Sequence, residues 1–134
     1  MIYLPDTNAL IHFLNPGPNA VKDHFLTVDP LFIRLCSVTK AELYYGAMKS
    51  TRSADNLKLL DEFFVNFDSC PFDDHAAVKY GEIRSDLARK GTPIGPNDLM
   101  IAAIALVHDA VVVTHNVREF SRVVGLKTVD WEIV

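Results

Sequence analysis

The sequence lacks the features that mark several broad classes of protein. Its two cysteines, Cys36 and Cys70, among 134 residues are too few for a disulfide framework or a cysteine zinc site, and they favour a reduced, cytoplasmic protein. The longest apolar run lies near Ala102–Val107, far short of the roughly 20 residues that a membrane-spanning helix needs. The first residues, Met1–Leu4, have neither a basic flank nor a cleavage signature, so we expect no export signal and no membrane partner.

An excess of positive charge is also missing. Acidic residues number 17 and basic residues 13, which gives a net charge of −4. This balance argues against a protein that holds nucleic acid through a broad cationic surface. It does not exclude an enzyme that engages nucleic acid through a bound metal ion. The hydrophobic share of 49% is enough for a packed core, and the length predicts one domain over residues 1–134.

Short apolar runs alternate with helical patterns along the chain. Predicted strands cover 2–4, 31–36, 69–72, 110–114 and 127–129, and predicted helices cover 7–13, 20–27, 38–49, 57–66, 76–90, 98–108 and 117–123. Strands that are apolar throughout, rather than alternating, are typical of parallel sheets covered on both faces. We therefore predict an α/β fold with three α/β/α layers and a central parallel sheet of four to five strands. Pro5 lacks a backbone donor, so we expect it at the last position of the first strand.

Four acidic residues stand just beyond predicted strands, or on helices that begin near the same edge of the sheet. They are Asp6, Glu42, Asp98 and Glu119. In an open parallel sheet, sites lie at the carboxyl ends of the strands, so these acids could meet in one pocket. Crowded carboxylates repel one another unless a cation is present, and oxygen-only ligands suit Mg²⁺ or Mn²⁺. Without these four acids the acidic and basic residues balance, so the net charge could be concentrated in that pocket.

Each acid also has a purely structural interpretation. Thr39 and Glu42 match a helix capping box, and Asp98 could simply favour a helix N-terminus. Asp6 could cap a helix or form an Asx turn, and Glu119 could be a solvated surface acid. The coincidence of all four at one edge favours the metal site, and a cap and a ligand are compatible roles.

Several stretches, in order and spacing, resemble the motifs of PIN-domain ribonucleases, and specifically of VapC-type toxins of bacterial toxin–antitoxin pairs. They are Leu4–Asn8, Ser37–Ala47, Pro93–Ala102 and Val113–Phe120, and the ending Gly125–Trp131 is also similar. The resemblance spans essentially the whole chain. It implies a PIN-like fold and an endoribonuclease that depends on Mg²⁺ or Mn²⁺.

The resemblance also implies roles for individual residues. Asp6, Glu42 and Asp98 match the three core acids of the family, and Glu119 matches the fourth. We expect Asp6 and Asp98 to bind the main ion, with Glu42 and Glu119 acting through water or holding a second ion. Direct hydrolysis would leave a 5′-phosphate and a 3′-hydroxyl. Supporting polar residues are expected at Thr7, Asn8, Thr114 and Asn116.

The sequence indicates the roles of arginines and histidines near the predicted site less specifically than those of the acids. Arg84 and Arg118 are the first candidates for phosphate contacts with RNA, although a solvated charge or an ion pair is the commoner role of each. None of the five histidines pairs with another at the i, i+4 spacing of a helical metal site. His115 alone lies beside the predicted site, where general-base chemistry and local hydrogen bonding are both open.

The resemblance further implies partners. A small VapB-type antitoxin would block the pocket, and an arginine that mimics the cation would be a physically sensible inhibitor. Family members typically form homodimers and larger toxin–antitoxin complexes that bind operator DNA through the antitoxin. Substrates in this branch are transfer RNAs, notably initiator tRNA cut in its anticodon loop.

The sequence supports two other functions unequally. A phosphatase of the aspartyl-phosphate type usually needs a second Asp two residues after its nucleophile, and Asn8 at that position disfavours this function. A non-catalytic RNA- or partner-binding module, whose acids hold a structural divalent ion, is the stronger alternative. Metal-dependent RNA cleavage distinguishes the nuclease from both.

Overall fold

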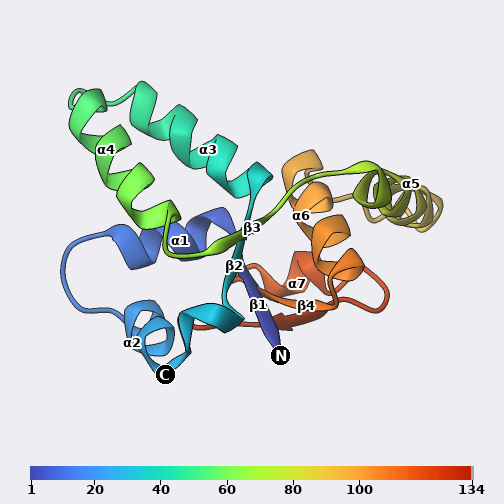
Figure 1. Ribbon diagram of the computed structural model, residues 1–134. Coiled ribbons are helices and arrows are strands. Elements are labelled where there is room, and N and C mark those ends of the chain that lie inside the picture. Colours follow the sequence, from blue (N-terminus) through green and yellow to red (C-terminus); the bar gives the residue numbers. More distant parts are fainter. Residues whose placement is uncertain (134) are drawn as a thin grey trace.

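Five parallel strands form the centre of the molecule (Figure 1). In a computed structural model, which describes residues 1–133, they are β1 (Ile2–Pro5), β2 (Arg34–Cys36), β3 (Asp68–Cys70), β4 (Ala110–Val113) and β5 (Lys127–Val129). β1 pairs with β4 and β4 with β5, while β2 pairs with β3, all in parallel. A single bridge between Tyr3 and Ile33 joins the two groups in the order β3-β2-β1-β4-β5. The predicted central parallel sheet is confirmed.

Pro5 explains why the sheet is nearly divided between β1 and β2. It is the last residue of β1, as predicted. The next residue, Asp6, donates its backbone N–H to the carbonyl of Val113 at 2.9 Å, toward β4. Backbone groups of successive strand residues point to alternate sides, so the N–H that Pro5 lacks would face β2. The ladder between β1 and β2 therefore cannot continue beyond the bridge at Tyr3.

Helices cover both faces of the sheet and give the predicted three layers. One face carries α5 (Asp74–Arg89), α6 (Pro96–Val107) and α7 (Val117–Phe120), and the other carries α1 (Thr7–Leu14), α2 (Ala20–Thr27), α3 (Ser37–Met48) and α4 (Ser53–Phe64). Alternate strand residues enter the two cores: Leu4 and Val112 enter the first, and Leu35 and Val113 enter the second. In α6, every residue from Ile101 to Ala105 is fully buried. Neither α6 nor any other helix of residues 1–133 is long and apolar enough to span a membrane.

Some element boundaries differ from the predictions because of local caps. Leu31 lies in a 3-10 helix, η1 (Pro30–Phe32), rather than in the predicted strand, since the Asp29 side chain accepts its N–H at 2.9 Å. Asp73 caps α5 by accepting the Ala76 N–H at 3.0 Å, so this helix begins earlier than predicted. α6 also begins earlier, at Pro96, a residue that suits the first turn of a helix.

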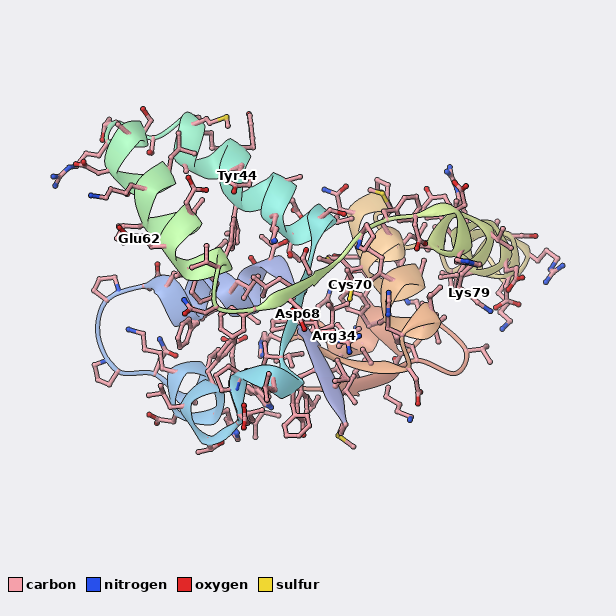
Figure 2. The ribbon with its side chains drawn as sticks, in the orientation of Figure 1. Arg34, Tyr44, Glu62, Asp68, Cys70 and Lys79 are labelled. Atoms are coloured by element: carbon pink, nitrogen blue, oxygen red, sulfur yellow. The ribbon has the colours of Figure 1, made fainter. Side chains whose placement is uncertain are left out.

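The two cysteines lie opposite each other on neighbouring strands. Cys36 of β2 is the register partner of Cys70 of β3, and both thiols are free and buried. Burial raises the pKa of each thiol, which favours the protonated and less reactive form. Figure 2 shows Cys70 beside Arg34 and Asp68, all three of which belong to this pair of strands. We therefore interpret both cysteines as core residues.

Candidate active site

A cleft of about 320 Å³ opens where β1 leads into α1 and where α6 begins. Its walls are formed by Asp6, Thr7, Asn8, Glu42, Gly95, Pro96, Asn97 and Asp98. Three of the four predicted acids therefore share one cavity, together with two of the predicted supporting residues. The carboxyl edge of the parallel sheet is where such a cavity is expected. No lysine or arginine is among its walls.

Asp6 is the most deeply placed of these acids, with only 6% of its surface exposed. Its Oδ1 atom caps α1 by accepting the Ala9 N–H at 2.8 Å, so the predicted cap is confirmed alongside the position in the cleft. Burial raises the pKa of the Asp6 carboxyl above its ordinary value, and the negative charges of Glu132 and Glu42 add to the rise. A hydrogen bond with Thr114 and the Ala9 N–H oppose it. A nearby cation would stabilise the charged form of this group.

Glu42 reaches the cleft from the second turn of α3. Its Oε1 atom accepts a hydrogen bond from the Thr7 hydroxyl at 2.7 Å, which ties α3 to α1. The capping-box interpretation is wrong. Because α3 begins at Ser37 after Cys36, Thr39 lies inside the helix and donates its hydroxyl to the Cys36 carbonyl at 3.0 Å. Glu42 is thereby free to face the cleft rather than its own helix end.

Asp98 occupies the first turn of α6, where the helix dipole favours a negative charge. Its pKa is nevertheless raised to about 6, first by burial and then by the charges of Glu119, Asp6 and Glu42. Acids from four separate segments of the chain therefore act on one another electrostatically. Carboxylates in this condition either take up protons or bind a cation.

Glu119 lies on α7 and is not among the walls of the cleft. Its Oε1 atom accepts the Gly95 N–H at 3.2 Å, and its Oε2 atom accepts a hydrogen bond from the Asn116 side-chain amide. It therefore connects α7 to the loop that begins α6, and it is not a fully solvated acid. Sequence reasoning missed the Gly95 donor, although the Gly-Pro pair before α6 is a recognisable turn signal.

The other predicted supporting residues, Thr114 and Asn116, contact the acids without lining the cleft. Thr114 is fully buried at the end of β4, where its hydroxyl contacts Asp6 and accepts the Asn116 N–H at 2.9 Å. Asn116 in turn holds Glu119. Arg122, which sequence reasoning did not single out for a role here, donates to the Pro93 carbonyl at 3.1 Å and fixes the same loop. The polar residues around the cleft thus form connected hydrogen bonds that orient its carboxylates.

The donor set fits a hydrated hard divalent ion. Within residues 1–133, the four predicted acids do not bring three ligand atoms within 4.8 Å of one another. Mg²⁺ commonly keeps several waters and is bound directly by only one or two carboxylates. Oxygen-only ligands, the raised pKa values of Asp6 and Asp98, and walls without a cationic side chain all agree with such an ion.

The two predicted RNA contacts lie near the cleft without lining it. Arg84, on α5, lies over the Tyr80 ring at 5.9 Å and donates to its hydroxyl at 3.1 Å. It borders a neighbouring cavity of about 290 Å³, and Pro96 is shared by that cavity and the cleft. Arg118 is exposed on α7, next to Glu119. Neither arginine forms an ion pair within the described part of the chain.

Comparisons with known proteins agree with the family resemblance of the sequence motifs. The sequence model of the PIN domain family matches residues 3–126. The tRNA(fMet)-specific endonuclease VapC of Salmonella typhimurium is 39% identical over 129 residues, which cover 96% of this chain and 97% of that protein. Ribonuclease VapC2 of Rickettsia felis is 35% identical over 133 residues, covering 98% and 99%. The crystal structure of DNA-bound VapBC from Salmonella typhimurium superposes with a TM-score of 0.90 at 38% identity, covering 98% of both chains.

Proposed function

Because the chain belongs to the PIN domain family, we propose that it is an endoribonuclease toxin of a toxin–antitoxin pair, hydrolysing phosphodiester bonds in RNA. Residues 1–134 would act as one PIN domain. The observation that carries this proposal is the crowding of carboxylates at the cleft, where burial first and then the charges of Glu119, Asp6 and Glu42 raise the pKa of Asp98 to about 6. Such crowding costs free energy in the isolated chain, and a nuclease metal ion supplies the missing positive charge.

Mg²⁺ or Mn²⁺ is the ion that this site suits. When bound, it supplies a Lewis acid that activates water and stabilises the leaving oxygen. Asp6 and Asp98 would hold it directly, with Glu42 and Glu119 acting through water or holding a second ion. The chain's own donors orient these acids: Thr7 holds Glu42, Asn116 holds Glu119, and Thr114 contacts Asp6.

Transfer RNA is the proposed substrate, with the anticodon loop of initiator tRNA as the specific candidate. The support is the name of the Salmonella typhimurium relative, a tRNA(fMet)-specific endonuclease. Arg84 and Arg118 are both exposed and lie beside the cleft rather than inside it. They could contact phosphates that flank the one being cut, while leaving the cleft to the metal ion.

A VapB-type antitoxin is the proposed partner, since related solved structures are VapBC complexes, some of them bound to DNA. We propose that operator DNA is bound through the antitoxin, because this chain has a net charge of −4. A homodimer and larger toxin–antitoxin assemblies, acting in the cytoplasm, complete the proposal.

A matched pair of variants tests the nuclease function. Glu42→Gln removes a charge from the cleft, whereas Glu62→Gln makes the same change on the outer side of α4 (Figure 2). Purified chain, freed of antitoxin, is mixed with tRNA and Mn²⁺, and cleavage is followed on a denaturing gel. We expect cleavage by wild type and Glu62→Gln, and a loss of roughly 100-fold or more in Glu42→Gln and Asp98→Asn.

The same experiment separates the nuclease from a binding module. If the wild-type chain binds tRNA with Mn²⁺ but leaves it intact, the acids serve a structural ion and the nuclease proposal is wrong. Growth arrest on expression, relieved by Asp98→Asn but not by Glu62→Gln, would support the nuclease in cells.

A further inference from the structure

A second group of potential ligands lies at the same edge of the sheet, beyond β4 and β5. His115 Nδ1 lies 3.0 Å from Asp130 Oδ2 and 3.2 Å from Glu132 Oε2. The ligand atoms of these three residues all fall within 4.8 Å of one another, which no other trio of histidine, cysteine or acid achieves in residues 1–133. His12 Nε2 lies 3.4 Å from the other oxygen of Glu132. We call these four residues the histidine cluster.

The fold holds the members of the histidine cluster in place. The Thr114 N–H donates to the Val129 carbonyl at 2.9 Å, so the segments that follow β4 and β5 leave the sheet side by side. Asp130 Oδ1 accepts the Glu132 N–H at 2.9 Å. That turn leaves Oδ2 facing His115, and the Asp130 side chain is only 10% exposed.

Trp131 anchors the segment between the two acids. It is buried, with its ring 5.2 Å from that of Tyr3 and 5.8 Å from that of His24. A further contact of 3.3 Å joins His24 Nε2 to the Ile133 carbonyl. Asp130 and Glu132 therefore flank a fixed residue rather than a free tail, and their positions do not depend on a bound ion.

The distances in the histidine cluster match those between ligands of one metal ion. Ligand atoms about 2.1 Å from a first-row metal ion lie about 3.0 Å apart in octahedral geometry and about 3.4 Å apart in tetrahedral geometry. The separations of 3.0 and 3.2 Å between His115 Nδ1 and the two carboxylate oxygens fall in this range. The two carboxylates of Asp130 and Glu132 would also bring negative charge for a cation to neutralise.

The chemistry of these ligands differs from that of the cleft. Imidazole nitrogen with carboxylate oxygen suits Zn²⁺ and neighbouring transition metals, whereas oxygen alone suits Mg²⁺. The His115 side chain is 67% exposed, so an ion can reach the cluster from solvent and complete its coordination with water. We propose that His115, Asp130 and Glu132 form a second metal site for Zn²⁺ or a similar transition ion.

Binding of Co²⁺, a spectroscopic substitute for Zn²⁺, tests this site independently of RNA cleavage. The full chain is titrated with Co²⁺ in excess Mg²⁺, which competes for the cleft, and the visible absorption of bound Co²⁺ is recorded. We expect one Co²⁺ per chain, displaced by Zn²⁺. His115→Ala and Asp130→Asn should each weaken binding by at least about tenfold, and Asp130→Asn keeps the shape of the side chain if His115→Ala folds poorly.

Two controls make the result decisive. His75→Ala removes an exposed histidine of α5 that lies outside the cluster, and Asp98→Asn alters only the cleft; both should bind Co²⁺ as wild type does. If wild type binds no Co²⁺ in excess Mg²⁺, the cluster is an ion-pair network and the proposal is wrong. Undiminished binding in His115→Ala, or loss of binding in Asp98→Asn, would overturn it equally, without bearing on the nuclease function.

Discussion

The cleft and the histidine cluster lie on the same edge of one sheet, yet they are built differently. The cleft collects acids from three distant segments, buries Asp6, and offers only oxygen ligands. The histidine cluster draws three of its members from two adjacent loops, is open to solvent, and offers imidazole nitrogen. The comparison teaches that position on a sheet brings charges together, whereas burial and ligand type decide which cation they suit.

The largest effect on RNA cleavage is expected from Asp6→Asn, which replaces one carboxylate oxygen of the cleft by an amide nitrogen. Asp6→Asn removes a negative charge from the cleft while asparagine still caps α1 as well as aspartate does. We expect RNA cleavage to fall roughly 100-fold or more, with little loss of thermal stability. Gel-based cleavage assays and thermal unfolding of the same sample provide the measurement. More than a tenth of wild-type cleavage in this variant would remove Asp6 from the metal site.

Thr114→Val tests whether the buried donor behind the cleft matters as much as the acids. Valine has nearly the same shape, but it cannot hydrogen-bond Asp6. We expect cleavage at limiting Mg²⁺ to fall about tenfold, because residues that orient metal ligands typically contribute 10- to 100-fold. Thr27→Val on the surface of α2 is the matched control. An unchanged Mg²⁺ dependence in Thr114→Val would mean that Asp6 needs no orienting partner.

The pH dependence of stability should identify the cleft as a site of crowded charge. Asp98 has a pKa of about 6 in the folded chain against an ordinary value of 3.8. The folded state therefore binds the proton more tightly, and the free energy of unfolding falls as pH rises from about 4 to about 6. For this half-buried carboxyl we expect a loss of about 1 kcal/mol after solvent screening is considered.

Denaturant unfolding in EDTA, across that pH range, measures this loss. Asp98→Asn should flatten the curve, and Mg²⁺ should restore stability to wild type above pH 6, where Asp98 is charged. If the wild-type and Asp98→Asn curves run parallel, burial and the neighbouring acids do not raise the pKa of Asp98 as the structure indicates.

The smallest effect on RNA cleavage is expected from Asn116, which holds Glu119 of α7 in place. Asn116→Ala releases the Glu119 carboxylate, which keeps its bond from Gly95. Since Glu119 stands behind the walls of the cleft, we expect cleavage to fall only about threefold, in keeping with the loss of one exposed hydrogen bond. Steady-state cleavage rates at saturating Mn²⁺ are the measurement. A loss as large as that of Asp6→Asn would place Glu119 among the direct ligands.

The difference between the two groups also explains what the sequence could predict. Asp6 and Asp98 could be predicted because Asp6 follows a strand and Asp98 lies at the start of a helix. A parallel sheet brings such positions to one edge. The histidine cluster could not be predicted from the sequence, because its residues are brought together by the register of β4 with β5 and by the turn at Asp130. The role of Thr39 could not be decided from the sequence, because a capping box and a buried helical threonine share one pattern.

Pro5 has a mechanical consequence for the whole molecule. Since one bridge alone joins β1 to β2, the sheet behaves as two ladders that meet along a seam. Glu42 lies on α3, which follows β2, whereas Asp6 follows β1. The Thr7–Glu42 hydrogen bond connects the two sides of the seam. Amide exchange should therefore reveal two cooperative units, one on each side of the Tyr3–Ile33 bridge.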